Sequence, residues 1–281
     1  MTNIKIFYFG GSSFISQYLL QDLIKKFSVT CISRKKVKNC NNYYFDLNKE
    51  ITKSFSVKIN NIKPDYIFFF SSYVPIKEEI SGWSDCKKTN ILGLINLLKH
   101  IKFRPKKIIL SSSCSIYGNK EKIFNEKSFL DPSTGYSLSK FSQEHIIRIF
   151  CNFNKIKFLS YRFGYVIGDN MKDERLVKRI WSKIKKKKNI RIYNKNKNLN
   201  LIHTKDISRM ILGTFKKAEG IFNLTYPKKT TLQNFYSMVR NNKGLKSCSN
   251  NNYSSNKFFH RFKKIKILKF KEVIKKFKNE N

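Results

Sequence analysis

The stretch that decides the fold reads KKIILSSSCSIYG at residues 106–118 and continues, after a polar loop, as GYSLSK at residues 135–140. Residues 106–110 form a short apolar run of the kind that builds a buried strand. The second part opens a helix, on which Tyr136 and Lys140 share one face because they are four residues apart. A lysine ammonium beside a phenol favours the phenolate and lowers the tyrosine pKa from about 10 toward working pH. The pair therefore predicts a general acid/base that exchanges a proton with a hydroxyl or carbonyl.

A serine hydroxyl lies at the end of the same predicted strand. Ser113 is placed to hold the oxygen whose proton is exchanged with Tyr136. The alternative is an amphipathic helix with a chance tyrosine and a solvated lysine, since Tyr-x-x-x-Lys alone is a common spacing. Features elsewhere in the chain favour the catalytic interpretation.

The N-terminal stretch combines a strand, a glycine turn and a helix. Residues 3–9 predict the strand, a turn follows at Gly10, and apolar residues at helical spacing begin at Phe14. In such a context a dinucleotide phosphate lies at the helix N-terminus. Gly10 holds the first place of the glycine-rich motif, whereas Ser13 and Ser16 stand where glycines are usual, and the Ser13 hydroxyl could itself bind phosphate. Taken alone, the motif is explained better by an ordinary turn between a strand and a helix.

Strands and helices alternate through the first half of the chain. Apolar runs predict the strands, and helical periodicity predicts the segments between them. The expected strands cover residues 3–9, 27–33, 42–45, 66–70, 106–110 and 158–161, and the expected helices cover residues 14–24, 49–61, 83–103 and 136–151. This order predicts an α/β fold with a doubly wound parallel sheet of the Rossmann type.

The texture of the sequence changes after residue 168. Later elements are expected at residues 173–187, 201–207, 221–224, 232–239 and 265–277, with an Asn/Ser-rich loop at residues 246–257. We expect a dinucleotide-binding Rossmann domain with the catalytic residues at 1–168. A smaller, variable α/β region at 169–281 is expected to bind the substrate and to be interleaved with the first.

The charge of the chain points to a compositional bias. The formal net charge is +40 over 281 residues, and 48 of the 58 basic residues are Lys. Strongly basic chains often bind nucleic acid, but Lys is spread through nearly every segment here and no basic stripe or binding motif stands out. We therefore expect no specific nucleic-acid partner, although the charge should raise association rates for anionic ligands such as nucleotides.

Cysteine usage and hydropathy indicate the cellular compartment of the protein. The six Cys are scattered without C-x-x-C or His/Cys ligand spacing, which predicts buried reduced thiols and no metal site. No run of about 18 apolar residues predicts a membrane span, and the N-terminus has no signal-peptide pattern. We expect a cytoplasmic protein without membrane association.

Several motifs agree in order and spacing, and together they are far more specific than any one of them. The chain resembles the extended short-chain dehydrogenase/reductases, in particular the NAD-dependent epimerase/dehydratase family that acts on nucleotide sugars. The stretches that carry the resemblance are residues 10–15, Asp46-Leu47, Pro64-Asp65, Asn90, residues 113–118, Tyr136 with Lys140, Arg162 to Gly168, and His203 with Asp206-Ile207.

The resemblance implies a role for each matching position. The implied catalytic group is Ser113, Tyr136 and Lys140. The implied cofactor contacts are Gly10, Ser12, Ser13, Phe14 and Ile15 at the pyrophosphate, Asp46 and Leu47 at the adenine, and Phe70, Ser71, Ser72, Asn90, Tyr136 and Lys140 toward the ribose and nicotinamide. The resemblance also implies a nucleotide-sugar substrate held by the C-terminal region. For Asp46 the alternative is a turn cap, and for Asn90 it is a bond to backbone.

The chain departs from the family pattern at positions that affect the chemistry. Leu199 stands where an arginine is usual, and Lys205 replaces an acidic residue. Dehydratases of this family carry an Asp-Glu pair directly after the catalytic Ser or Thr, whereas this chain has Cys114 and Ser115. We therefore expect a nucleotide-sugar reductase or epimerase that uses hydride transfer, and not a 4,6-dehydratase. A non-catalytic or nucleic-acid-binding member of the same fold is the alternative.

The cofactor preference depends on the end of the second predicted strand. The adenosine ribose lies there in this fold, and an acidic residue at that place selects NAD. No Asp or Glu occurs between Val29 and Tyr44, and the strand ends at Ser33-Arg34. A guanidinium can hold a 2′-phosphate through two hydrogen bonds, and the serine hydroxyl can donate to the same group. We expect NADP(H) or NAD(H), with NADP(H) slightly favoured, which tilts the function toward reduction.

Two predicted helices suggest a homodimer. The resemblance implies that helices 83–103 and 136–151 pair across a two-fold, four-helix interface. The apolar surface expected there comes from Ile91, Leu94, Ile95, Leu98, Ile146, Ile147 and Phe150. The alternative is that all of these side chains face the sheet of a monomer.

Overall fold

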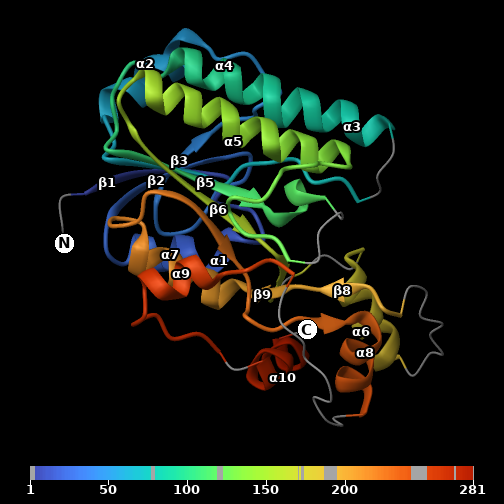
Figure 1. Cartoon of the computed structure of the whole chain (residues 1–281). Helices are drawn as coiled ribbons and strands as arrows, with labels where there is room; N and C mark the ends of the chain where they lie inside the picture. The colour runs from blue at the N-terminus through green and yellow to red at the C-terminus, as the bar shows by residue number, and fades with distance from the viewer. Residues whose placement is uncertain are drawn as a thin grey trace.

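A seven-stranded parallel sheet forms the centre of the molecule, with strand order β10-β6-β5-β4-β1-β2-β3 (Figure 1). The computed structural model describes residues 4–76, 80–118, 123–169, 171, 174–186, 195–241, 252–268 and 270–280. The strands are β1 (Lys5–Phe9), β2 (Ser28–Ser33), β3 (Asn41–Tyr44), β4 (Tyr66–Phe69), β5 (Lys107–Ser113), β6 (Lys157–Phe163) and β10 (Gly220–Leu224). Helices cover both faces, so the predicted doubly wound α/β fold is confirmed.

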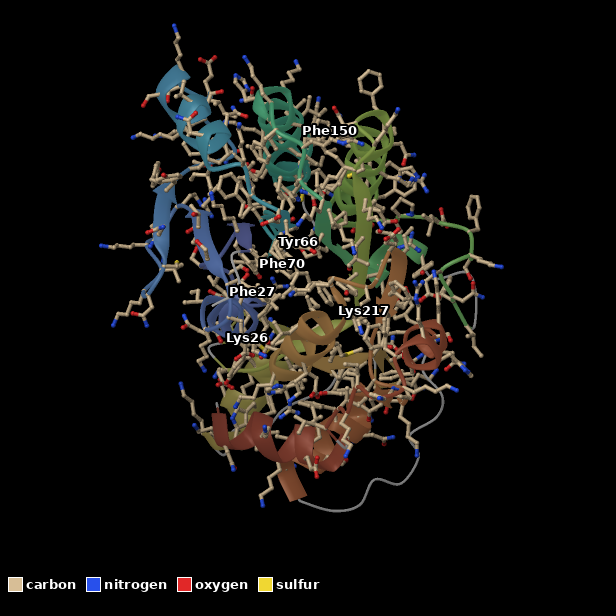
Figure 2. All side chains as sticks on the ribbon, turned by 90° about the vertical axis from the view of Figure 1, so that its left-hand side faces the viewer. Lys26, Phe27, Tyr66, Phe70, Phe150 and Lys217 are labelled. Atoms are coloured by element: carbon tan, nitrogen blue, oxygen red, sulfur yellow. The ribbon has the colours of Figure 1, made fainter. Side chains whose placement is uncertain are left out.

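The sheet is apolar on both faces, as expected for strands buried between two helical layers. One face is covered by α2 (Lys53–Ile62), α4 (Gly93–His100) and α5 (Gly135–Phe153), and the other by α1 (Ser16–Ile24) and α7 (Thr204–Thr214) (Figure 1). Successive residues of β1 alternate between the two cores: Phe7 and Phe9 pack with α4 and α5, whereas Ile6 and Tyr8 pack with α1 and α7. Figure 2 shows the same division, with Phe150 on one side of the sheet and Tyr66 and Phe70 on the other.

The strand order reverses between β1 and β4, and parallel sheets bind ligands in the crevice outside the strand ends at such a point. Gly10, directly after β1, has φ +86°. A Cβ on Gly10 would lie 2.6 Å from the carbonyl oxygen of Phe70, which follows β4. Only glycine fits this position, so the ends of the two strands approach closely where a dinucleotide is expected.

Two element boundaries near the switch point, where the strand order reverses between β1 and β4, differ from the prediction. β5 continues three residues beyond Leu110, because its ladder with β6 extends to the pair Ser113 and Phe163. The single helix expected at 83–103 consists of α3 (Ile80–Cys86), a π-helical segment and α4. The π-helical segment, Lys87–Leu92, carries the buried Asn90, and such segments often lie at functional sites.

The C-terminal part builds a third apolar core beside the large sheet. Its strands form two small ladders: β7 (Tyr165–Ile167) with β9 (Leu201–His203), and β8 (Asn198–Leu199) with β11 (Thr230–Thr231). Its helices are α6 (Leu176–Lys185), α8 (Leu232–Asn241) and α10 (Phe270–Glu280), which lie together at one end of the molecule (Figure 1). The remaining helix, α9 (Asn256–Arg261), packs on β10 of the large sheet. The division at residue 168 stays a prediction.

The C-terminal prediction was wrong at its edges. The terminal helix was expected from residue 265, but α10 begins at Phe270. Ile265 and Leu268 precede it outside any helix, where they contact α7. Ile265 packs on Gly213, and the Leu268 N–H donates to the buried Asp206 carboxylate at 3.2 Å. The loop expected at 246–257 lies partly outside the described residues, and its last two residues already belong to α9.

The exposed apolar residues of the α3–α5 layer differ from those expected at a dimer interface. Leu94, Leu98 and Ile147 are buried in the monomer core, so that part of the prediction was wrong. The exposed apolar side chains on these helices and the π-helical segment are Ile80, Trp83, Leu92, Leu138, Ile149 and Phe153. No helix among the described residues is long and apolar enough to cross a bilayer.

The described cysteines are free thiols. Cys31, Cys86, Cys114 and Cys151 are buried and Cys40 is half-buried, in agreement with the prediction of reduced thiols. Cys248 lies outside the described residues.

Candidate active site

The three predicted catalytic residues come from elements that contact each other at the carboxyl edge of the sheet. Ser113 ends β5, and Tyr136 and Lys140 lie in the first two turns of α5. The helix begins there because of a capping box. Thr134 Oγ1 accepts from the Ser137 N–H at 3.1 Å, and Ser137 Oγ accepts from the Thr134 N–H at 2.9 Å. The cap fixes Tyr136 in the first helical turn, one turn before Lys140.

Lys140 is the buried cation of the site, with 2% of its surface exposed. Its Nζ donates to Ser72 Oγ at 2.9 Å and to Gln143 Oε1 at 2.8 Å. Burial lowers the pKa of Lys140 to about 7, although the nearby charge of Glu144 opposes this shift. An ammonium carries three N–H donors, and the bonds within the described residues use two of them. One donor therefore remains for an acceptor that the described residues do not supply.

Ser113 is held by its own capping interaction. Its Oγ accepts from the Ser115 N–H at 3.1 Å and shares a hydrogen bond of 2.9 Å with Ser115 Oγ. This contact starts a short 3₁₀ helix, Cys114–Tyr117. When Ser115 donates in the shared bond, the Ser113 hydroxyl keeps its own proton for an outside acceptor.

Asn90 braces the loop after β4 against α5. Its side chain accepts from the Tyr73 N–H at 2.7 Å and donates to the Tyr73 carbonyl at 3.0 Å and to Ser139 Oγ at 2.9 Å. The Ser139 hydroxyl in turn donates to the carbonyl oxygen of Tyr136 at 2.8 Å. Both amide donors of Asn90 are used within the protein, so the alternative of a bond to backbone describes it here. Its contact with a cofactor stays a prediction.

A buried ion pair lies one turn beyond Lys140. Glu144 accepts from Arg162 Nη2 at 2.5 Å and Nε at 3.1 Å, and also from Ser160 Oγ at 2.8 Å. Burial alone would raise the pKa of Glu144, but the hydrogen bonds and charge of Arg162 outweigh it, so the pKa is lowered. Arg162 also donates to the Tyr117 hydroxyl at 2.7 Å. Such pairs are costly to break, so this one fixes α5 against β6.

The two serines that replace glycines in the predicted phosphate-binding turn, Ser13 and Ser16, form hydrogen bonds within the protein. Ser16, at the usual place of a glycine, is fully buried and accepts from the Tyr8 hydroxyl at 3.0 Å. Its own hydroxyl donates to the Gly10 carbonyl at 3.0 Å, and it lies 2.7 Å from Ser13 Oγ. Burial raises the pKa of Tyr8, so this phenol keeps its proton and donates. Sequence reasoning missed Tyr8, whose only signal was a polar atom inside an apolar strand.

The remaining predicted cofactor residues surround the same edge. Ser12 is exposed, Phe14, Ile15 and Ser71 are half-buried, and Leu47 and Phe70 are buried. Asp46 caps a turn, since its carboxylate accepts from the Asn48 N–H at 3.0 Å. Arg34 is exposed just after β2. The Ser33 hydroxyl donates to the Lys35 carbonyl at 2.6 Å, which differs from the expected contact with a phosphate.

Cys114 is unsuited to acid/base work. Its thiol is 1% exposed and donates to the Arg162 carbonyl at 3.2 Å. Burial raises its pKa well above the ordinary value, although the charge of Arg162 opposes the shift. The thiol therefore packs as a buried apolar group, as the sequence interpretation favoured.

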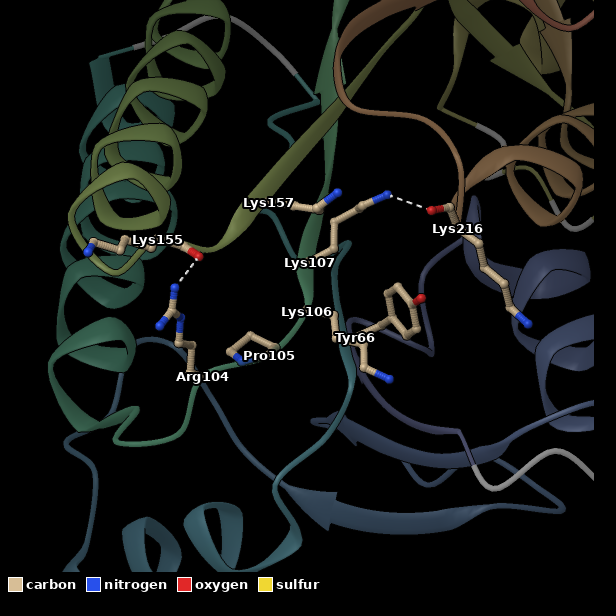
Figure 3. Close-up of a pocket in the computed structure, with 8 residues that line it drawn as sticks. All are labelled: Tyr66, Arg104, Pro105, Lys106, Lys107, Lys155, Lys157 and Lys216. Carbon is tan, nitrogen blue, oxygen red and sulfur yellow. Dashed lines mark hydrogen bonds between the residues drawn. The ribbon is translucent and has the colours of Figure 1, made fainter.

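A basic hollow of about 450 Å³ lies at the opposite, amino edge of the sheet (Figure 3). Most of the residues that line it are cations: Arg104, Lys106, Lys107, Lys155, Lys157 and Lys216, beside Tyr66 and Pro105. Acids and carbonyls of the protein engage several of them. Lys106 pairs with Asp65, Lys157 pairs with Glu219, and the Arg104 guanidinium donates to a backbone carbonyl. Cations at the ends of helices offset the negative helix termini, and this explains the hollow without a ligand.

Comparisons with known proteins agree with the fold. The model of the NAD dependent epimerase/dehydratase family matches residues 6–224. The dTDP-D-glucose 4,6-dehydratase of Dictyostelium discoideum is 26% identical over 250 residues, which are 78% of this chain and 58% of that protein. The chain therefore spans somewhat more than half the length of that relative.

Solved structures show the same architecture. The UDP-glucose 4-epimerase of Thermotoga maritima with UDP-glucose has a TM-score of 0.84 at 20% identity, covering 99% of this chain and 98% of that one. The UDP-glucuronic acid 4-epimerase of Bacillus cereus, in complex with UDP-glucuronic acid and NAD, has a TM-score of 0.84 at 17% identity, with the same coverage. Since the family model covers more than half of the chain, the protein belongs to the NAD dependent epimerase/dehydratase family, within the extended short-chain dehydrogenase/reductases.

Proposed function

We propose that the protein is an NAD(P)-dependent enzyme that epimerises or reduces a nucleotide sugar by hydride transfer. The observation that carries the proposal is the buried Lys140, one helical turn from Tyr136. Its pKa is lowered to about 7 by burial, and its third N–H has no acceptor among the described residues. It lies at the edge where the strand order reverses. The epimerases with the same fold are described with UDP-sugars, which supports this substrate class.

The residues of the switch point fit a dinucleotide. The chain after β1 passes so close to the end of β4 that a Cβ on Gly10 would meet the Phe70 carbonyl. It also passes close to β2, since a Cβ on Gly11 would lie 2.3 Å from Cys31 Sγ. Bare backbone N–H groups at the start of a helix are the donors that a pyrophosphate accepts. Gly10 to Ile15 would hold the pyrophosphate, and Lys140 would donate to a ribose hydroxyl.

Tyr136 is proposed to move the proton. A bound nicotinamide would supply the acceptor, or the donor, of the hydride that leaves or joins a sugar carbon. As the carbon–hydrogen bond of a carbinol breaks, the Tyr136 phenolate takes the hydroxyl proton, and a carbonyl forms. In the reverse direction the phenol returns that proton. Lys140 stabilises the phenolate by its charge, and Ser113 donates a hydrogen bond to the reacting oxygen.

Dehydration is not supported by the groups that follow Ser113. Elimination needs an acid and a base beside the sugar ring, and the two positions hold Cys114 and Ser115. The thiol is buried and has a raised pKa because of burial, and the Ser115 hydroxyl is hydrogen-bonded to Ser113 at the start of the 3₁₀ helix Cys114–Tyr117. Although one relative is named a 4,6-dehydratase, the proposed chemistry is epimerisation or reduction.

The substrate survey that tests the proposal uses the full chain with NAD or NADPH and a panel of nucleotide sugars. Mass spectrometry detects reduction as a gain of two hydrogens, and NMR detects inversion of a ring carbon. We expect conversion of at least one UDP- or dTDP-sugar by the parent protein and none by Tyr136→Phe. A protein that binds cofactor and sugars but converts none would support the alternative, a non-catalytic member of the fold.

A homodimer is proposed as the assembly. Six exposed apolar side chains lie on α3, the π-helical segment and α5, and Ile149 and Phe153 are 66% and 87% exposed. A second copy would remove this surface from water. Light scattering at micromolar concentration is expected to give twice the chain mass, and Ile149→Asp is expected to give the monomer. A monomeric parent protein would refute the proposal.

A further inference from the structure

Gln143 forms a closed hydrogen-bonded ring with Lys140 and Ser72. The Lys140 ammonium donates to both Ser72 Oγ (2.9 Å) and Gln143 Oε1 (2.8 Å), and the Ser72 hydroxyl donates to the same Oε1 at 3.1 Å. The direction of each bond follows from chemistry, because an ammonium has only donors and the amide oxygen only accepts. A flipped amide would place donors against donors, so the oxygen of Gln143 faces the lysine.

The amide of Gln143 is fully buried, with 0% of its surface exposed. Its Nε2 has no hydrogen-bond partner among the described residues. A buried, unpaired donor destabilises the fold, and an apolar side chain of similar shape would avoid that cost. The benefit that offsets the cost therefore lies at the other end of the amide, where the oxygen holds the ammonium.

The ring also sets the direction of the remaining donor. Nζ carries three N–H bonds in tetrahedral arrangement, and two of them point at Ser72 and Gln143. With two directions fixed, the third is fixed as well. If only Ser72 held it, the flexible lysine side chain would lose one of its two restraints, and the third N–H would no longer have one orientation.

We propose that Gln143 is a positioning residue, whose amide oxygen holds Lys140 charged and oriented for the reaction. This inference rests on the proposed function for its catalytic consequence. Its structural part, the hold on the ammonium, concerns the free protein and can be measured without turnover.

Three substitutions on α5 separate this role from general damage to the helix. Gln143→Met keeps an unbranched side chain of similar length but removes the acceptor. Gln143→Glu keeps the acceptor and adds a charge. Ile147→Val is the control, because Ile147 is buried on the same helix one turn farther on and has no polar atom.

The first readout is the pKa of Lys140, measured in the cofactor-free protein by ¹⁵N NMR of the lysine side-chain ammonium groups. The Lys140→Arg variant assigns the signal of Lys140. Losing one charge-assisted hydrogen bond is expected to lower the pKa in Gln143→Met by about one unit. Gln143→Glu should raise it, and Ile147→Val should leave it unchanged. Equal pKa values in Gln143→Met and Ile147→Val would overturn the proposal, and Gln143→Glu tests it independently if the Met variant does not fold.

The second readout is the pH profile of kcat/KM with the sugar identified in the survey. The charged lysine is the active form, so activity falls as pH rises through its pKa. That fall should move to lower pH in Gln143→Met and to higher pH in Gln143→Glu. If the NMR shifts occur but no variant and no parent protein converts any sugar, the positioning role stands and the proposed reaction fails. If turnover is present and its pH profile is the same in all variants, the positioning role is refuted.

Discussion

The two edges of the sheet each bury a lysine, and the two lysines differ in how their donors are used. Lys107 and Lys140 are both 2% exposed, and burial lowers the pKa of each. At the amino edge, Lys107 Nζ donates to the carbonyls of Phe215, Lys216 and Ala218 at 2.9, 3.0 and 2.6 Å, so all three donors are engaged (Figure 3 shows the bond to Lys216). At the carboxyl edge, the part of the chain that the structure describes gives Lys140 two side-chain acceptors and leaves one of its donors without a partner.

The difference shows how one residue type serves either structure or chemistry. Backbone carbonyls just after α7 are acceptors that the helix leaves unpaired, and Lys107 satisfies them as a C-terminal cap. Ser72 and Gln143 use two of the three donors of Lys140, and no other described residue accepts from the third; Tyr136 lies one helical turn away at the same edge. Burial alone therefore does not identify a catalytic lysine, whereas an incomplete set of acceptors at the switch point favours one.

The largest expected effect concerns the carboxyl edge. Tyr136→Phe removes the group proposed to move the proton, so turnover should fall by about 10²- to 10⁴-fold while cofactor affinity changes little. Steady-state kinetics and fluorescence titration with NADPH measure the two quantities. Tyr236→Phe is the control, since Tyr236 is also half-buried but lies on α8, where its hydroxyl bonds to Arg240. Near-normal turnover of Tyr136→Phe would show that the acid/base has been misassigned.

Substitution of Lys107 at the amino edge should lower the stability of the protein and leave its turnover unchanged. Lys107→Met leaves three carbonyls without their donor, so the free energy of unfolding should fall by about 3 kcal/mol. Urea unfolding measures it, and the turnover of the folded fraction should be unchanged. Lys106→Met is the matched control, because its exposed pair with Asp65 is screened by solvent and should contribute little to stability. If the two variants lose equal stability, Lys107 is not a cap.

The places of the glycine turn, Ser113 and the pair Tyr136 and Lys140 in the fold were predictable, because they follow local rules of strand end, turn and helical spacing. Their roles in catalysis and cofactor binding stay predictions. The hydrogen bond between Tyr8 and Ser16 could not be predicted, since it joins a strand to a helix across a turn. In the sequence, the only sign of this turn's chemistry is that serines replace the usual glycines. The seven-stranded parallel sheet was predictable in class but not in strand order, which tertiary pairing decides.

Gln143 and Glu144 were also out of reach of sequence reasoning. On a helix with many polar residues, a Gln and a Glu predict a solvated face, and only the packing of α5 on β6 shows that both are buried. The dimer surface failed for a related reason. When a helix carries apolar residues on two faces, the sequence does not show which face packs on the sheet. Leu94, Leu98 and Ile147 lie in the core.

The pH dependence of stability gives a smaller effect with a defined sign. The pKa of Lys140 is about 7 in the folded protein, below its unfolded value, so below about pH 7 both states hold the proton and the folded state carries the full cost of the buried charge. As pH rises toward the unfolded pKa, the folded state loses its proton first and is stabilised. The stability of the parent protein relative to Lys140→Met should therefore rise by about 1 kcal/mol or more between about pH 6 and pH 9. A pH-independent difference in urea unfolding would contradict the lowered pKa.

The smallest expected effect concerns the exposed cations of the two edges. If Arg34 holds a 2′-phosphate, Arg34→Ala should weaken NADPH binding by about tenfold and leave NADH binding unchanged. Lys155→Ala, which removes the same charge at the basic hollow, should affect both cofactors alike and weakly. The parent protein should bind NADPH more tightly than NADH in fluorescence titration. Equal affinities would remove the basis for a preference and favour an epimerase that retains NAD.

Hydride transfer, measured in a single turnover, distinguishes most directly between the lysines of the two edges. The protein is loaded with NAD or NADP and mixed with a UDP-sugar found in the survey, and the near-ultraviolet absorbance of reduced nicotinamide is followed by stopped flow. We expect a rapid rise in the parent protein, a rise of the same rate in the folded fraction of Lys107→Met, and a rate at least about 10²-fold lower in Lys140→Met. Equal rates in Lys140→Met and Lys107→Met would contradict the claim that the carboxyl edge, and not the amino edge, holds the catalytic lysine.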